Sequence, residues 1–429
     1  MASELSQRPC LIGTVALECR HAWQALRSGS WLTPARGRGY SLILLAIAAL
    51  AILGWIVLSD GLVDRNGKPI GTDFSSFYAA GALALEGKAA DAYSMAAHYA
   101  REQQLFGANT PYYGWLYPPI FFVLAAPLAL LPYPLALAVW QGSTLALYLA
   151  VIAAILYRAR RRNGVIARLW LPVAAAFPAV VINLGHGQNG FLSAALFGAA
   201  LICLPRRPII AGTLFGLLAY KPQLALVIAF ALPAAGQWRA VTAAAAAAIV
   251  LASLSLLLFG ADAWWSFLAS TETSRKLLLE EGNVGFEKLQ SAFAAVRMWG
   301  GSVTLAYMVQ GAISAVVISG AAWVWRSNQH LDVKAALLLA ATPLASPHIL
   351  DYDLMLLAPS LAFIVAARSD AAHFRNYEIS LLASVWIAPL IARTIAGLTA
   401  VPIGFLASLI LFVLIVRVPR RCEEPVSAL

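Results

Sequence analysis

Charged residues are scarce in this chain: 12% of its 429 residues are Asp, Glu, Lys or Arg, whereas 61% are hydrophobic. Soluble domains carry about twice that charged fraction, so the composition excludes an ordinary water-soluble fold. Solid apolar runs recur along most of the chain, and a membrane β-barrel would instead show alternating residues. The sequence therefore predicts an all-α polytopic membrane protein.

Cysteine is also rare, with Cys10, Cys19, Cys203 and Cys422 as the four residues of this type. They form no Cys-x-x-Cys pair and have no spacing typical of a metal site. All four fall on or near the predicted cytoplasmic side, which argues against a disulfide framework in the external loops. No repeat of fixed period is visible, so a solenoid is not indicated.

The excess of positive charge predicts the orientation in the membrane. The net charge is +10, and the basic residues stand in short clusters between apolar runs, as at 158–162. This is the positive-inside pattern rather than a nucleic-acid-binding surface. With both termini in the cytoplasm, inside segments hold 20 of the 30 basic residues and 7 of the 20 acidic residues.

Twelve spans fit this orientation. They are 41–59, 135–157, 169–184, 191–204, 209–220, 224–235, 240–259, 303–325, 333–346, 354–367, 379–391 and 401–416. The predicted organisation is a basic cytoplasmic segment (1–40), a transmembrane domain (41–417) with external loops at 60–134 and 260–302, and a cytoplasmic tail (418–429).

The first external loop is predicted to be helical. Two short helices are expected at 74–86 and 91–106, separated by Gly87. The apolar segment 119–131 is too short to span comfortably and is expected to lie in the outer interface. In the 240–259 span, the run Ala243–Ala248 offers small residues that permit close helix packing.

Polar groups at membrane depth are costly and often mark function, and here they gather at the outer ends of helices. Asp73 precedes a predicted helix and is either its N-cap or a general base. Tyr117 opens the interfacial helix at Tyr-Pro-Pro, a sequence that suits a first turn. His186, Gln188 and Asn189 share one tight turn, which either has turn chemistry alone or binds sugar hydroxyls.

Two cations in predicted outer turns between spans go against the positive-inside trend. Lys221 and Arg393 both fall on the predicted outer side. Lys221 either extends to the interface or binds an anion there. The segment 346–353 adds His348, Asp351 and Asp353, and His348 could donate to a phosphate or sugar. A metal site at the Asp-x-Asp pair is not expected, because no further acidic partner is nearby in sequence.

These motifs, taken in order, resemble glycosyltransferase family 87 of the GT-C superfamily. The resemblance covers nearly the whole chain after residue 40, and its best-known members are polyprenol-phosphate-mannose-dependent α-(1→2)-mannosyltransferases. It rests on Gly71-Thr-Asp-Phe-Ser-Ser-Phe-Tyr78, Tyr117-Pro-Pro119, Gly187-Gln-Asn189, Lys221-Pro-Gln223 and Ser346-Pro-His348 with the acids that follow.

The resemblance implies a GT-C-type bundle with Asp73 as the catalytic base in the first external loop. It implies inverting transfer of a sugar, mannose in the best-known members, from a polyprenyl phosphate to a lipid-linked or glycan hydroxyl. Lys221, His348 and Arg393 are the candidates for binding the donor phosphate. His186, Gln188, Asn189, Tyr117 and Asp351 are the candidates for binding sugar or acceptor. No cofactor or metal is expected.

The expected location is the cell (inner) membrane, with the site on the external or periplasmic side. The expected partners are the lipid bilayer, the lipid-linked sugar donor and a glycolipid or glycan acceptor. The alternative function is a polytopic transporter or flippase for a lipid-linked or amphipathic anionic substrate, which would favour internal symmetry and broken helices. A glycan polymerase or ligase would differ in using a larger donor.

Overall fold

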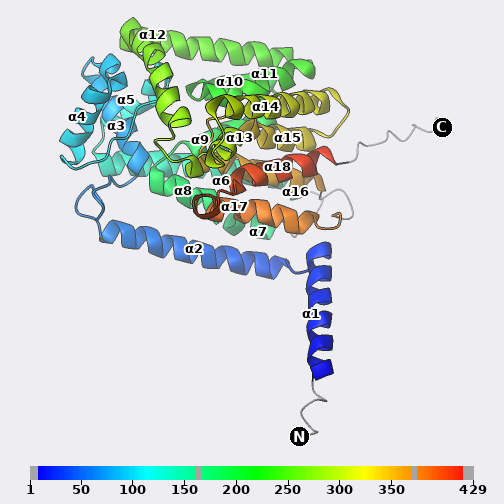
Figure 1. The fold of residues 1–429 in the computed structure, drawn as a ribbon. Coiled ribbons are helices and arrows are strands. Elements are labelled where there is room, and N and C mark those ends of the chain that lie inside the picture. The colour runs from blue at the N-terminus through cyan, green and yellow to red at the C-terminus, as the bar shows by residue number, and fades with distance from the viewer. Residues whose placement is uncertain (1–7, 161–165, 369–373, 419–429) are drawn as a thin grey trace.

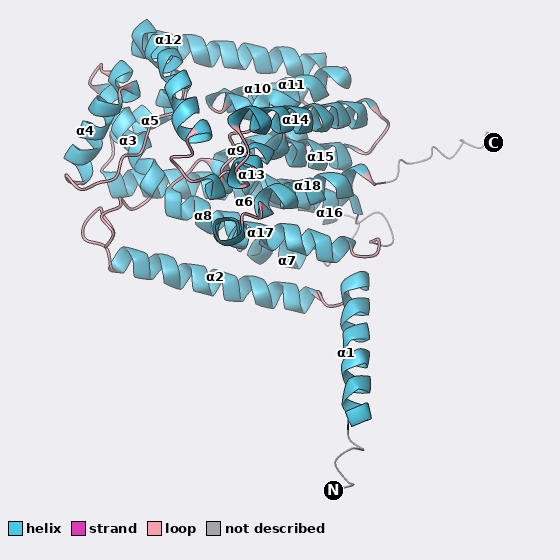
Figure 2. Ribbon diagram, viewed as in Figure 1, coloured by secondary structure: helices cyan, strands magenta, loops and turns pink. Residues whose placement is uncertain are grey.

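The computed structural model describes residues 8–160, 166–368 and 374–418 (Figure 1). Within these ranges the chain folds into helices and forms isolated β-bridges but no β-strand (Figure 2). Part of the basic cluster 158–162 and all but the first residue of the predicted tail 418–429 lie outside the described residues.

The α-helices follow one another as α1 (Arg8–Ser28), α2 (Pro34–Val57), α3 (Thr72–Leu85), α4 (Met95–Phe106), α5 (Phe122–Ala129), α6 (Tyr133–Arg160), α7 (Ile166–Ala175), α8 (Pro178–His186), α9 (Gly190–Cys203), α10 (Pro208–Gly216), α11 (Ala225–Ala234), α12 (Trp238–Arg275), α13 (Ala292–Met298), α14 (Val303–Arg326), α15 (Leu331–Leu344), α16 (Leu357–Arg368), α17 (Glu378–Thr399) and α18 (Ile403–Val416). Short helical turns join several of them, including η7 (Asp351–Leu356) before α16.

Five described helices are long and apolar enough to cross a membrane: α2, α6, α12, α14 and α17. They run roughly alongside one another (Figure 1), as expected of a polytopic membrane protein. The other seven of the twelve predicted spans correspond to shorter helices or to pairs of helices. The number of spans therefore stays a prediction.

Several predicted boundaries differ from the structure. The predicted span 379–391 continues as α17 to Thr399, so Arg393 lies within this helix. The helix of the first span begins at Pro34 rather than at residue 41, because Thr33 caps it and proline suits the first turn. The predicted span 169–184 is interrupted before Pro178, so it forms α7 and α8. The predicted end of the span at residue 259 coincides with a kink at Gly260, where φ is 81° and the backbone is non-helical, but the first part of the predicted loop is a second helical segment of α12 that ends at Arg275.

The exposed surfaces and the core fit a bilayer. Helix α2 leaves large apolar side chains such as Leu50 and Val57 about 70% exposed, which is stable where lipid replaces water. Helix α15 is the opposite case, because almost all of its side chains are buried. It packs against α11, α14, α16 and α18 and forms the centre of the bundle.

Small residues allow α10 and α12 to pack closely, as the run Ala243–Ala248 predicts. A Cβ atom at Gly212 would lie 2.2 Å from the Ala240 carbonyl oxygen, and one at Gly216 would lie 2.5 Å from that of Ala244. Larger side chains at these positions would force the helices apart.

The segment predicted to be the first external loop forms a helical unit at one end of the bundle (Figure 1). Its helices α3 and α4 match the two predicted helices closely, with a short turn between them. Helix α5 confirms the predicted helix at 119–131 and packs against α3. A Cβ at Gly81 would lie 2.2 Å from the Ala125 carbonyl oxygen, so the two helices are in close contact.

Candidate functional site

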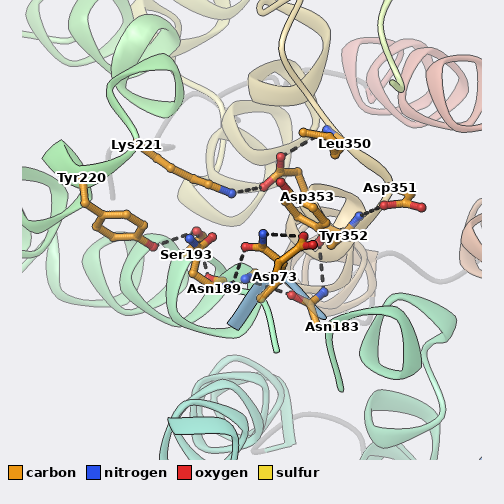
Figure 3. Close-up of polar contacts among 12 residues, drawn as sticks. Asp73, Asn183, Asn189, Ser193, Tyr220, Lys221, Leu350, Asp351, Tyr352 and Asp353 are labelled. Atoms are coloured by element: carbon orange, nitrogen blue, oxygen red, sulfur yellow. Dashed lines mark hydrogen bonds and ion pairs between the residues drawn. The ribbon is translucent and has the colours of Figure 1, made fainter. Parts of the chain in front are cut away.

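Four segments that are far apart in sequence meet in one cluster of polar side chains (Figure 3). They are the first turn of α3, the turn between α8 and α9, the connection from α10 to α11, and the connection from α15 to α16. Gln188, in the turn between α8 and α9, donates a hydrogen bond to Asp73 on α3. Asn183, on α8, donates to the Tyr352 carbonyl in the connection from α15 to α16. An ion pair between Lys221 and Asp353 links that connection to the one from α10 to α11.

Asp73 lies in the first turn of α3 but is not its cap. The residue before the helix is Gly71, and no side chain caps the helix end there. One Asp73 carboxylate oxygen accepts a hydrogen bond from Gln188 Nε2 at 2.8 Å, and the other lies 3.8 Å from His186 Nδ1. The Asp73 side chain is 27% exposed. The carboxylate is therefore fixed in place, stabilised by the helix N-terminus, and still accessible.

The turn at 186–189 is built to approach α3. Helix α8 ends at His186, and Gly187 adopts a left-handed conformation with φ of 64°. A Cβ at Gly187 would lie 2.4 Å from the Cβ of Phe74, so both the conformation and the close contact require glycine. Trp140 Nε1 donates to the Gly187 carbonyl. His186 Nδ1 lies 2.8 Å from Thr72 Oγ1.

Tyr117 fixes the orientation of the Gln188 amide. Its hydroxyl donates to Gln188 Oε1 at 3.2 Å and accepts from Asn189 Nδ2 at 2.8 Å. The Asn189 backbone N–H also donates to Gln188 Oε1. Because the amide oxygen accepts two hydrogen bonds, the Gln188 NH₂ group is directed at Asp73. Burial raises the pKa of Tyr117, with the charges of Asp353 and Asp73 adding to the shift, so the phenol keeps its proton.

Lys221 is buried and paired rather than extended to the interface. Its Nζ donates to Asp353 Oδ1 at 2.6 Å, and the two side chains are 4% and 2% exposed. The ammonium also lies 4.8 Å from the ring centre of Tyr352, a cation–π distance. The other Asp353 oxygen accepts the Leu350 backbone N–H. Lys221 is therefore neutralised by Asp353. The two residues are 132 positions apart in sequence, so the sequence alone does not predict this pair.

His348 and Asp351 lie in the connection from α15 to α16. Burial lowers the pKa of His348, against an opposing effect of the Asp353 charge, so the imidazole is neutral at pH 7. Burial raises the pKa of Asp351, and the charges of His186 and Arg393 offset part of that shift. Arg393 is exposed on α17. The charges of Arg393 and Asp73 thus both act on Asp351, in opposite directions.

Asn183 joins two of the segments. Its Nδ2 donates to the Tyr352 carbonyl at 3.0 Å, and its Oδ1 accepts the Gly190 backbone N–H at 2.9 Å. A Cβ at Gly190 would lie 2.4 Å from Asn183 Oδ1. Asn183 is not among the predicted site residues, although an amide within an apolar helix was a signal that the sequence offered.

The carboxylates of the Asp-x-Asp segment do not face each other. Asp353 is directed at Lys221, whereas Asp351 accepts the Tyr352 backbone N–H on the other side (Figure 3). Among the described residues, no group of three or more His, Cys, Asp or Glu side chains is placed to share a metal ion.

The site therefore presents one fixed, accessible carboxylate beside amide, hydroxyl and imidazole groups, with an exposed cation nearby. Comparison with known proteins gives a match to the model of glycosyltransferase family 87 over residues 115–347, which is more than half of the chain. The match includes Tyr117, Gln188 and Lys221 but neither Asp73 nor Arg393. No curated protein and no solved structure matches. The chain belongs to glycosyltransferase family 87 and is a membrane glycosyltransferase.

Proposed function

We propose that the protein transfers a sugar, mannose by resemblance, from a polyprenyl-phosphate donor to a hydroxyl of a glycolipid or glycan on the external face of the inner membrane. Asp73 is the general base, and the reaction inverts the anomeric carbon. The observation that carries this proposal is the Asp73 carboxylate, which is held by Gln188 yet 27% exposed. Asp351 and Asp353 are 4% and 2% exposed, so they are much less accessible to an acceptor.

The reaction needs one base and one means of stabilising the leaving group. Asp73 takes the proton of the acceptor hydroxyl as its oxygen bonds to the anomeric carbon. The bond from that carbon to the phosphate oxygen breaks, and its electron pair leaves with polyprenyl phosphate. Because this leaving group is an anion, it needs positive charge and hydrogen-bond donors rather than an acid.

The roles of the cations follow from their exposure. Arg393 is exposed and is assigned to the donor phosphate, with neutral His348 as a hydrogen-bond donor. Lys221 is paired with Asp353, so that carboxylate offsets part of the positive charge that Lys221 offers to the donor phosphate. His186, Gln188, Asn189, Tyr117 and Asp351 are assigned to sugar and acceptor hydroxyls. Nothing favours the transporter alternative, and the family is one of glycosyltransferases.

The test is transfer by the purified protein in lipid nanodiscs. Radiolabelled mannosyl, glucosyl and galactosyl polyprenyl phosphates would each be supplied with a glycolipid extract as acceptor, and nucleotide sugars would serve as control donors. We expect labelled product and an equal amount of released polyprenyl phosphate with one lipid-linked donor. Transfer from a nucleotide sugar alone would contradict the proposal.

A further inference from the structure

Two buried titratable side chains on α4 bind the same loop residue. Glu102 and His98 are both 0% exposed. Glu102 Oε2 accepts the backbone N–H of Tyr113 at 3.0 Å, and His98 Nε2 donates to the Tyr113 carbonyl at 3.0 Å. Both backbone polar groups of one loop residue are thus held by one helix.

Burial favours the neutral form of both side chains, whose His98 Nε2 and Glu102 Oε1 atoms lie 3.7 Å apart. Burial raises the pKa of Glu102 to about 8, and the charge of Asp73 adds to this effect. Burial lowers the pKa of His98 to about 4. The two groups therefore act as neutral hydrogen-bonding partners of the loop. Because both are fully buried, neither can contact a substrate directly.

The same two side chains contact the first turn of α3, where Asp73 lies. Ser75 Oγ, which donates to the Thr72 carbonyl at 2.7 Å, lies 3.5 Å from Glu102 Oε1, and Ser76 Oγ lies 3.3 Å from His98 Nε2. These serines follow Asp73 by two and three residues in sequence. Helix α4 therefore fixes the catalytic turn and the Tyr113 loop relative to each other.

Tyr113 itself is half-buried, and its phenol lies within electrostatic range of Asp73. Burial raises the pKa of this phenol, and the charge of Asp73 is the next largest cause. An aromatic face with a hydroxyl suits a sugar or polyol, whose C–H groups stack and whose hydroxyls form hydrogen bonds. Arg393 and His348 come from α17 and from the α15–α16 connection, whereas Tyr113 is attached to α4. The acceptor and the donor phosphate would thus approach Asp73 from different segments.

We propose that Glu102 and His98 are positioning residues that hold Tyr113 beside Asp73, where its side chain forms part of the binding site for a sugar or polyol acceptor. This inference rests on the proposed function of Asp73 as the base. Tyr113, His98 and Glu102 all lie outside the residues 115–347 that match the family model.

The test is a double-mutant cycle in the transfer assay with Glu102→Ala, Tyr113→Ala and both together. Loss of a hydrogen bond of this kind lowers an equilibrium constant by about tenfold. We expect each single change to raise the acceptor KM by about tenfold while the donor KM stays the same. If Glu102 acts through Tyr113, the double variant should resemble Tyr113→Ala. The proposal would be overturned if the acceptor KM of the double variant rose by the product of the two single increases. It would also be overturned if the donor KM and the acceptor KM rose equally.

The conservative variant Glu102→Gln retains an oxygen that can accept the Tyr113 N–H, so it should recover most of the acceptor affinity lost in Glu102→Ala. Gln104→Ala, at an exposed position of the same helix, is the matched control. Hydrogen–deuterium exchange in the absence of substrate gives a readout independent of activity. The Tyr113 amide should exchange faster in Glu102→Ala than in Glu102→Gln or in the parent. If the Tyr113 amide exchanged at the same rate in all three proteins, the positioning role would be refuted. If Glu102→Ala speeded this exchange but the parent protein showed no transfer activity, only the proposed function would be refuted.

Discussion

The buried ion pair between Lys221 and Asp353 predicts a characteristic pattern of stability. Each charge is removed from water and is compensated mainly by the other, at 2.6 Å. Removing one partner of such a pair leaves an uncompensated buried charge and costs about 3–5 kcal/mol. Replacing both by apolar residues of similar volume is often neutral or stabilising. Lys221→Met and Asp353→Leu should therefore each destabilise the protein, and the double variant should be close to the parent.

The expected size can be related to a melting temperature. For 429 residues, the average unfolding entropy of globular proteins corresponds to about 0.9 kcal/mol/K, so a loss of ~4 kcal/mol lowers Tm by about 4 °C. Scanning fluorimetry of the four proteins in one detergent would measure the shifts. A double variant whose Tm shift equals the sum of the two single shifts would refute the pairing, because uncoupled residues contribute additively.

Three further outcomes follow from the structure. The pKa of the Glu102 carboxyl is raised to about 8 in the folded protein, so between its ordinary pKa and pH 8 the folded state holds a proton that the unfolded state has lost. The free energy of unfolding should therefore fall by about 2 kcal/mol from pH 6.5 to 8. Glu102→Gln should remove this fall in a pH series of unfolding curves. Gly190→Ala should lower Tm and turnover together, because its Cβ would lie 2.4 Å from Asn183 Oδ1; an unchanged Tm would refute the tight contact. In a cysteine-free background, an impermeant thiol reagent on intact cells should label Glu281→Cys but not Asn328→Cys, both exposed positions; equal labelling would contradict the proposed topology.

Hydropathy and turn residues were sufficient to predict most helices. Long apolar segments such as α6 and α14 were placed within a few residues, and Gly87 separated the two helices of the first loop as expected. Errors arose where helix ends depend on local backbone geometry. The backbone is non-helical at Gly260, and a second helical segment of α12 follows this kink as far as Arg275. Hydropathy does not detect such a less apolar helical segment.

The candidate site was predictable in part, because polar residues at the outer ends of helices are conspicuous in an apolar chain. The contact between Asp73 and Gln188 joins residues 115 positions apart, and spacing cannot reveal such a partner. The same holds for Lys221, because its partner Asp353 is 132 positions away in sequence. The sequence does not distinguish Glu102 and His98 from the other polar residues of the first loop. Their complete burial, which only the structure shows, sets these two apart.

The central claim is that the Asp73 carboxylate removes the proton of the acceptor hydroxyl, and the direct test is turnover of Asp73→Asn with saturating donor and acceptor. Asparagine keeps the size of the side chain and can still accept the hydrogen bond from Gln188. Asp91→Asn, the same change at an exposed position of the first loop, is the matched control. We predict that Asp73→Asn lowers turnover by about 10²–10⁴-fold with Tm unchanged, while Asp91→Asn stays active. Near-normal turnover of folded Asp73→Asn would contradict the account.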